Sequence, residues 1–256
     1  MPQLTPPVQP LPAATHINEM NGLISLAGVL TLLLLAGLAM GLLDRNRFSL
    51  RWLLLAALLV AINDASLTLL YGAVPDLVGG GRNWQGKLLA LAATLALAAH
   101  PAVGWPRVGL TFKQAPDSLR SALPVALLYC GFFVGIALAF PNGDVSGEDI
   151  AFQLTLPGFE EEPFYRGILL FALGLAYTGR WRFLGVDWGW GAVLSCVLFG
   201  LAHAFGYSDG RYTFDGITMA LTALPSFIAV WLRLRTGSLL LPVVLHNFGN
   251  AITLLL

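Results

Sequence analysis

Residues 23–43 read LISLAGVLTLLLLAGLAMGLL, an almost entirely apolar stretch without a charged side chain. A membrane-spanning helix needs about 20 consecutive apolar residues, so this stretch alone is long enough to cross a bilayer. Of the chain's 256 residues, 57% are hydrophobic and only 11% are charged, whereas soluble domains carry roughly 25% charged residues. The composition therefore predicts a polytopic helical membrane protein. It excludes a soluble enzyme, a coiled coil and a disordered chain.

Seven further apolar stretches follow along the chain. They cover about residues 52–71, 87–99, 119–140, 157–176, 190–205, 214–232 and 238–256. We therefore predict an all-α membrane protein with about eight transmembrane helices and a site between the late ones. Residues 1–18 hold five prolines and no Lys or Arg, and we expect them to form a flexible tail. Residues 19–145 then supply the first four helices, and residues 146–256 supply the last four.

The loops divide the basic residues unevenly. If the N-terminus lies outside and the spans alternate, the inner loops receive ten Lys and Arg residues. The outer loops receive only Arg82, Lys87 and Arg211. Because cytoplasmic loops are enriched in Lys and Arg, the pattern predicts a multi-pass protein of the cell membrane with both termini outside. The 14 basic and 14 acidic residues cancel, so the charge indicates no nucleic-acid partner.

Three of the five glutamates are consecutive and open the fifth stretch, in the string GFEEEPFYRGILL. Ionisable groups at membrane depth are costly and mark function by default. In a helix, Glu162 and Arg166 share a face, so Arg166 can neutralise Glu162 while Glu161 points elsewhere. We expect Pro163 in a first helical turn and take Glu160 as a residue of the membrane boundary. The alternative is a solvated glutamate run with Arg166 reaching outward.

Two histidines lie within later stretches. His203 follows Phe199 by four residues in LFGLAHAFG, and His246 precedes Asn250 by four in LPVVLHNFGNA. Each of these pairs therefore occupies one helix face. A lone histidine in an apolar helix is usually a satisfied core group. Two histidines with an asparagine on the same face and a pair of glutamates favour a functional site instead.

The three strings together resemble the CPBP family of intramembrane proteases, which includes the CaaX prenyl endopeptidases, the bacterial Abi proteins and the myxosortases. The family pattern is EExxxR, then FxxxH, then HxxxN on successive late helices. Here it is carried by Glu161-Glu162 with Arg166, Phe199 with His203, and His246 with Asn250. The resemblance covers roughly residues 150–256, and the first four stretches carry no motif.

This resemblance implies a glutamate-type endopeptidase that works inside the lipid bilayer. Its substrate would be a membrane protein or a lipid-modified peptide, cleaved near the C-terminus. By the same resemblance, Glu161 with His203 would activate a water molecule. His246 and Asn250 would stabilise the oxyanion.

The resemblance also implies that Glu162 with Arg166 would hold the first carboxylate in place. We expect a metal-free mechanism and no cofactor. Zinc is the alternative, because Glu161, His203 and His246 are residue types that bind it, although an HExxH motif is missing. The sequence indicates no oligomeric state.

Two other classes of function stand beside the protease. One is a non-catalytic member of the same family, acting as a membrane chaperone, immunity protein or scaffold. The other is a proton-coupled transporter that uses Asp64 and Glu161, against which the missing internal repeat argues. CaaX-type members cleave on the cytosolic side, whereas the predicted orientation places Glu161 near the outer face. Either that orientation is wrong or the substrate is a non-prenylated segment outside the cytoplasm, and we favour the second.

Overall fold

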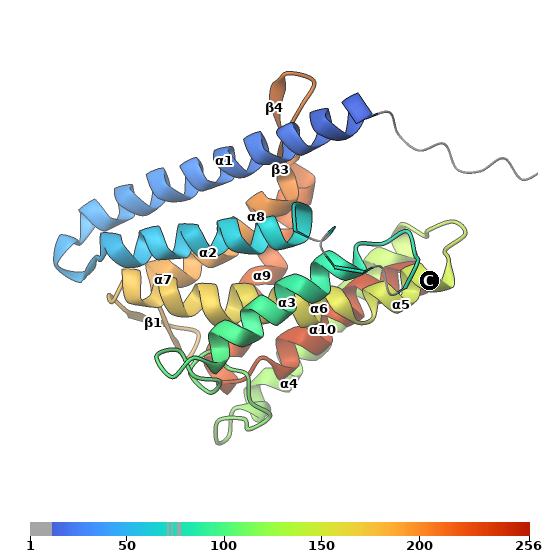
Figure 1. The fold of residues 1–256 in the computed structure, drawn as a ribbon. Coiled ribbons are helices and arrows are strands. Elements are labelled where there is room, and N and C mark those ends of the chain that lie inside the picture. The colour runs from blue at the N-terminus through green and yellow to red at the C-terminus, as the bar shows by residue number, and fades with distance from the viewer. Residues whose placement is uncertain (1–11, 71, 73, 76–77) are drawn as a thin grey trace, which may run out of the picture.

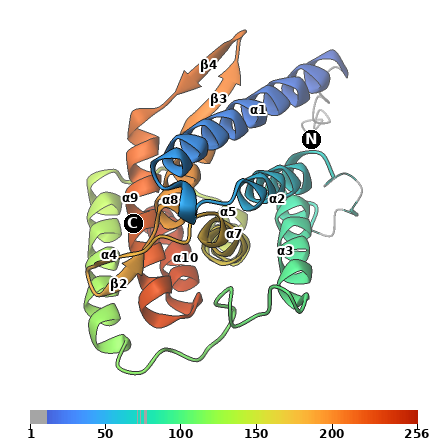
Figure 2. The ribbon, with the colours of Figure 1, turned by 90° about the vertical axis from the view of Figure 1, so that its left-hand side faces the viewer.

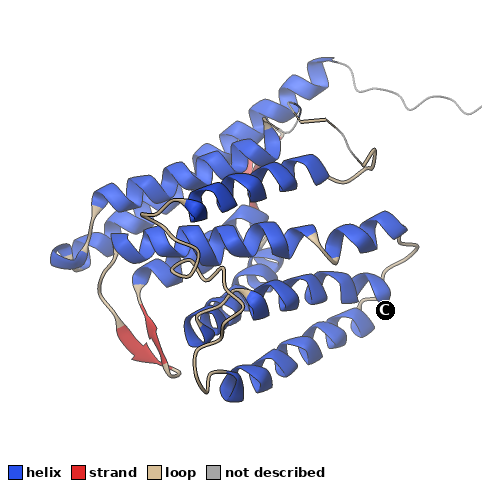
Figure 3. Ribbon diagram, turned by 60° about the horizontal axis from the view of Figure 1, so that its bottom comes forward, coloured by secondary structure: helices blue, strands red, loops and turns tan. Residues whose placement is uncertain are grey.

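The computed structural model describes residues 12–70, 72, 74–75 and 78–256. Its elements are α1 (Pro12–Leu43), η1 (Arg45–Arg47), α2 (Leu50–Thr68), α3 (Trp84–Ala99), α4 (Leu119–Ala139), α5 (Gly147–Gln153), α6 (Leu156–Glu162), η3 (Pro163–Leu169), α7 (Leu170–Ala176), β1 (Trp181–Phe183), β2 (Val186–Trp188), α8 (Trp190–Ala204), β3 (Phe205–Ser208), β4 (Arg211–Phe214), α9 (Gly216–Thr236) and α10 (Leu240–Leu255). Helices dominate the fold (Figure 3), and within the described part the strands form two small antiparallel hairpins. The predicted all-α membrane fold is confirmed.

Each predicted apolar stretch coincides with a helical segment. Within the described residues, four helices are long and apolar enough to cross a membrane, in α1, α2, α4 and α9. The helices α3, α8 and α10 are shorter and also apolar. The remaining stretch is built from α6, η3 and α7, which follow one another without a break.

Three features differ from the sequence prediction. Helix α1 begins at Pro12, so part of the stretch expected as a tail is helical, while residues 1–11 lie outside the described residues. The acidic segment before the fifth stretch contains the short helix α5, which Ser146 and Asp149 start with a reciprocal capping box. The two β-hairpins were not predicted either, because strands of three or four residues are too short to show a period in the sequence.

The segment α6–η3–α7 lies at the centre of the molecule. Figure 2 views α7 nearly end-on, with α2 and α3 to one side and α4, α9 and α10 to the other. Its apolar side chains Leu169 and Leu173 are fully buried in the main hydrophobic core, together with Leu53 of α2. This central placement explains why the segment carries charged side chains away from lipid.

Pro163 does not stand in a first helical turn, contrary to the sequence prediction. It follows Glu162 directly inside the continuous segment and opens the π-helical turn η3. Proline lacks an N–H, and its ring clashes with the carbonyl four residues earlier. π-helical turns are rare, occur mostly as single turns inside α-helices, and are frequent at functional sites.

The basic loops gather at one end of the molecule, as the alternation of spans predicts. The Ser49 N–H donates to the Ala176 carbonyl at 2.8 Å, which joins the loop after α1 to the end of α7. The Leu239 N–H donates to the Gly109 carbonyl at 2.8 Å, which joins the loop after α9 to the loop after α3. In Figure 1 this basic end is the one that carries β1, and the C-terminus lies at the opposite end.

Candidate active site

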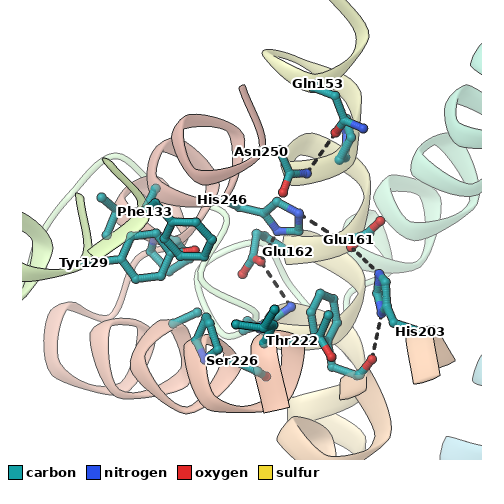
Figure 4. A pocket seen from close by; sticks show the side chains of 18 of the residues that line it. Tyr129, Phe133, Gln153, Glu161, Glu162, His203, Thr222, Ser226, His246 and Asn250 are labelled. Carbon is teal, nitrogen blue, oxygen red and sulfur yellow. Dashed lines mark hydrogen bonds and ion pairs between the residues drawn. The ribbon is translucent and has the colours of Figure 1, made fainter. Parts of the chain in front are cut away.

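A cleft of about 380 Å³ opens between the central segment and the helices α4, α8, α9 and α10. All six sequence-predicted site residues line it: Glu161, Glu162, Arg166, His203, His246 and Asn250. Figure 4 shows the two histidines on either side of Glu161, each approaching from a different helix. Three motifs that are far apart in the sequence therefore meet at one cavity.

The cleft depends on a close approach of α6 to α10. The Gly158 N–H donates to the Asn247 side-chain oxygen at 2.7 Å. A Cβ atom on Gly158 would collide with that side chain and with the Val243 carbonyl. Glycine at this position therefore lets α10 pack close enough to bring His246 beside the glutamates.

Glu161 is the residue at which the contacts converge. Its Oε2 atom lies 3.7 Å from His246 Nε2 and 3.9 Å from His203 Nε2. Its Oε1 atom lies 2.6 Å from the Lys87 Nζ atom. Oε1 is therefore held by an ammonium group, while Oε2 is buried without a hydrogen-bond partner and faces both imidazoles.

Lys87 is a site residue that the sequence analysis missed. It lies in α3, not in an outer loop, and it also pairs with Glu160 Oε2 at 2.7 Å. Glu160 was expected at the membrane boundary, but its side chain is 0% exposed. A buried carboxylate needs a counter-charge, and Lys87 provides it. The sequence did contain a signal for it, because Lys87 is a lone lysine at the start of an apolar stretch. Ionisable residues in such stretches indicate a functional site.

Glu162 connects Arg166 with His246. Glu162 Oε1 lies 3.1 Å from an Arg166 guanidinium nitrogen and 2.7 Å from His246 Nδ1. The pairing of Glu162 with Arg166 follows from their four-residue spacing on one helix face. The geometry differs from the implied role in one respect, because this pair holds the imidazole of His246, whereas Lys87 holds the carboxylate of Glu161.

His203 has a fixed orientation at the mouth of the cleft. Its Nδ1 atom lies 2.8 Å from the Phe199 carbonyl oxygen. A carbonyl oxygen only accepts, so Nδ1 carries the proton and donates, which leaves Nε2 free to accept on the side of Glu161. The ring also packs on the Phe199 ring at a centroid distance of 4.6 Å. The side chain is 37% exposed, so solvent reaches it.

Asn250 lies one helical turn beyond His246 and is held by Gln153. Its Nδ2 atom donates to Gln153 Oε1 at 3.0 Å. Gln153 ends the unpredicted helix α5, and no sequence pattern pointed to it. The hydrogen bond fixes the Asn250 amide at the wall of the cleft.

The charges around the cleft nearly balance. Three carboxylates, Glu160, Glu161 and Glu162, face two permanent cations, Lys87 and Arg166. Arg166 is only 2% exposed and lies 4.0 Å from the Phe199 ring centroid, where a cation–π contact adds to its ion pair. One negative charge is left over. His246 lies between two of these carboxylates, Glu161 and Glu162.

No group of three or more His, Cys, Asp or Glu side chains is arranged to hold a metal ion in the part of the chain that the structure describes. Glu161, the carboxylate that the zinc alternative requires, pairs through Oε1 with the ammonium group of Lys87. The two cysteines, Cys130 and Cys196, are free. The site is therefore built from carboxylate, imidazole, amide and cationic side chains.

Comparison with known proteins shows what the C-terminal part of the chain is similar to. Over 144 residues the chain is 32% identical to an "Uncharacterized 24.3 kDa protein" of Escherichia coli, a match that covers 51% of this chain and 60% of the relative. The chain thus spans less than two thirds of that relative's length. No solved structure matches the chain. Residues 149–252 match the family described as type II CAAX prenyl endopeptidase, Rce1-like. This match contains all three motifs, so the resemblance that they predicted is confirmed over this part of the chain.

Proposed function

We propose that the chain is an intramembrane endopeptidase that hydrolyses a peptide bond near the C-terminus of a membrane-associated substrate. One observation carries this proposal: Glu161 Oε2 faces the Nε2 atoms of His203 and His246 across a cleft within the helical, membrane-spanning part of the fold. The family description supports the class of reaction.

Glu161 and His203 bind and activate the attacking water. The 3.9 Å between Glu161 Oε2 and His203 Nε2 is too long for a direct hydrogen bond and suits a bridging water. Both atoms accept, so they take the two hydrogens of the water and leave an oxygen lone pair for the substrate carbonyl. Glu161 removes one proton as the C–O bond forms and later returns it to the leaving amine nitrogen as the C–N bond breaks.

His246 and Asn250 stabilise the oxyanion of the tetrahedral intermediate. His246 Nδ1 donates to Glu162, so Nε2 also has to carry a proton if it is to donate to the oxyanion. The imidazolium form meets both requirements, and the surplus carboxylate of the cleft supplies its counter-charge. Asn250 adds an amide donor. Each donor aimed at a developing oxyanion lowers the activation free energy by about 3 kcal/mol.

The mechanism needs no metal ion. A zinc ion would have to bind Glu161 Oε2 close to the ammonium group of Lys87, which lies 2.6 Å from Oε1 and repels a second cation. We therefore expect the activity to resist chelators. Loss of activity in a chelator, with recovery on added zinc, would contradict this mechanism.

The substrate reaches the cleft from the lipid between α4 and α9. An apolar groove of about 370 Å³ lies between these helices and shares Tyr129, Phe133 and Pro225 with the cleft. The exposed side chains Leu128 and Leu224 line its outer part. This continuity lets an apolar or lipid-modified segment remain among apolar side chains while the adjoining peptide bond meets Glu161.

The test compares Glu161→Gln with the wild-type protein in the native host. Glutamine has nearly the same shape but cannot act as a base. The C-termini of membrane and surface proteins are read by mass spectrometry, and a C-terminal segment retained only in the variant identifies the substrate. Asp144→Asn, which removes an exposed acid outside the cleft, is the matched control and should leave the C-termini unchanged.

The result also separates the enzyme from its non-catalytic alternative. Suppose that C-termini are the same with wild-type protein and Glu161→Gln, and that both are inserted at equal levels. The proposal is then wrong, and a chaperone, immunity or scaffold role takes its place.

A further inference from the structure

A second polar cavity lies at the basic end of the molecule, away from the mouth of the cleft. It has a volume of about 240 Å³ and is enclosed by α7, the end of α9 and the loops before α4 and β1. Four arginines line it: Arg107, Arg166, Arg180 and Arg233. We call it the arginine cavity. Such a concentration of guanidinium groups around a small cavity calls for an explanation.

Backbone carbonyls, not carboxylates, hold three of these arginines in place. Arg180 donates to the Gly174 carbonyl at 2.9 Å at the end of α7. Arg233 donates to the carbonyl of Arg107 at 2.8 Å, and Arg107 itself donates to the Pro101 carbonyl at 2.6 Å. These hydrogen bonds fix the guanidinium groups without neutralising them. The positive charge of all three remains.

The lining of the arginine cavity carries little negative charge. Asp187 is the one carboxylate among the described residues that line it, and it pairs with Arg182 outside the cavity at 2.9 Å. Burial lowers the pKa of Arg180, which Asp187 offsets only in part. In addition, the Nε atoms of Arg166 and Arg233 are buried without a hydrogen-bond partner.

The backbone makes room for this arrangement. Gly109 adopts a φ of +79°, and a Cβ atom there would collide with the guanidinium group of Arg233. Gly174 and Gly167 also line the cavity. The four arginines therefore border this space together with glycines and apolar side chains.

Aromatic side chains are exposed beside the cavity. The neighbouring hairpin β1–β2 and the start of α8 expose Trp181, Phe183 and Trp190. Aromatic side chains of this kind collect at membrane–water interfaces. The basic loops meet at the same end, and basic pockets between transmembrane helices on that side suit anionic headgroups.

We propose that the arginine cavity binds a phosphate group, supplied by the headgroup of an anionic phospholipid. Guanidinium groups bind phosphate through pairs of parallel hydrogen bonds, so several arginines around a small cavity match this ligand. The bound phosphate compensates the charges of Arg107, Arg180 and Arg233. It also lies at the far side of Arg166, whose other contacts reach Glu162 in the catalytic cleft.

The experiment measures the thermal midpoint of the purified full-length protein in detergent. Phosphatidylglycerol, phosphatidylcholine with the same acyl chains, or inorganic phosphate is added at constant ionic strength. A ligand that binds only the folded state raises the midpoint. We expect phosphatidylglycerol to raise it by several degrees more than phosphatidylcholine does. The thermal midpoint does not depend on proteolysis, so this experiment tests the arginine cavity independently of the proposed function.

Variants of Arg233 connect the effect to the cavity. Arg233→Gln should lose at least half of the increment from phosphatidylglycerol, and Arg233→Lys, which keeps the charge, should retain most of it. Arg120→Gln removes an exposed charge at the same end of the molecule and should retain the whole increment. An increment that Arg233→Gln and Arg120→Gln reduce equally would overturn the proposal, because it would then reflect general surface charge.

The remaining outcomes distinguish the source of the phosphate. If inorganic phosphate gives the same increment as phosphatidylglycerol, again dependent on Arg233, the phosphate site is supported and the lipid source is overturned. If Arg233→Gln does not fold, native mass spectrometry of the wild type decides instead. One phosphatidylglycerol retained in preference to phosphatidylcholine supports the site, and equal retention overturns it.

Discussion

The Nζ atom of Lys87 lies 2.6 Å from Oε1 of Glu161. This contact joins α3, in the half of the chain without a recognisable motif, to the carboxylate on which the proposed chemistry depends. It fixes one oxygen and leaves the other, Oε2, for the two histidines. The N-terminal helices are therefore part of the site and not only its scaffold.

Lys87→Met should damage both stability and activity. Removing one partner of a buried ion pair typically costs about 3–5 kcal/mol of folding free energy, and here two carboxylates lose their partner. The double variant Lys87→Met/Glu160→Gln removes one of those charges and should regain much of the thermal midpoint. Its cleavage rate should stay at least about tenfold low, because Glu161 is no longer oriented.

The control for these two variants is Lys113→Met, which removes an exposed lysine from a loop. It should change neither the thermal midpoint nor the cleavage rate. Cleavage at the wild-type rate by the double variant would show that Lys87 serves only to neutralise Glu160.

His246→Gln should lower kcat by about 10²–10³-fold and leave KM nearly unchanged. A donor to the oxyanion acts in the transition state and contributes little to substrate binding. Steady-state kinetics on the substrate identified with Glu161→Gln would measure both constants. A rise in KM at constant kcat would instead assign His246 to substrate binding.

Gln153 should act only through Asn250. Its single visible role at the cleft is the 3.0 Å hydrogen bond that it accepts from the Asn250 amide. We expect Asn250→Ala to reduce the cleavage rate more than Gln153→Ala does, and the double variant to be no slower than Asn250→Ala alone. If the fold reduction in the double variant equals the product of the two single reductions, the two side chains act independently.

The sequence was most informative where interacting residues lie on one helix. Glu162 with Arg166, and His203 with the Phe199 carbonyl, are four residues apart, and a helical period places them together. The order and spacing of the three motifs were then enough to identify the resemblance to CAAX-type proteases, which the match over residues 149–252 confirms. The roles of the individual site residues stay predictions.

The contacts between helices were not visible in the sequence. Lys87 and Glu161 are separated by 74 positions, and Asn250 and Gln153 by 97. Such pairings depend on how helices pack, which a single sequence does not specify. The π-helical turn after Glu162 was missed for a related reason, because proline is equally compatible with a helix start, and only the continuous core around α6 and α7 shows which applies.

The contact between α5 and the loop before α3 should make stability depend on pH. Glu148 accepts hydrogen bonds from the backbone N–H groups of Gly81 and Arg82 and from the Trp84 indole, each at 3.0 Å. These bonds lower the pKa of Glu148 below its ordinary value of 4.5. Because the pKa of Glu148 is lower in the folded state, its carboxylate stabilises the fold fully above the pKa of the unfolded chain. This stabilisation is lost as the pH falls through the pKa of the folded state.

Glu148→Gln provides the comparison. The wild type should have the higher thermal midpoint near neutral pH, and the gap should close below about pH 4, where the free carboxylate takes up its proton. A gap that is independent of pH would mean that the shape of the side chain, not its charge, holds this loop and the start of α3.

Thiol labelling should reveal which membrane face the cleft opens to. Gly143 lies in the loop between α4 and α5, with nothing within 4 Å of an added Cβ atom, and Phe112, at the opposite, basic end, is 86% exposed. The charge distribution predicts that an impermeant thiol reagent labels Gly143→Cys in intact cells, and Phe112→Cys only after permeabilisation. The unsubstituted chain controls for its own two cysteines. The reverse pattern would place Glu161 near the cytoplasm, where a prenylated C-terminus becomes the fitting substrate, whereas the expected pattern favours a segment cleaved outside it.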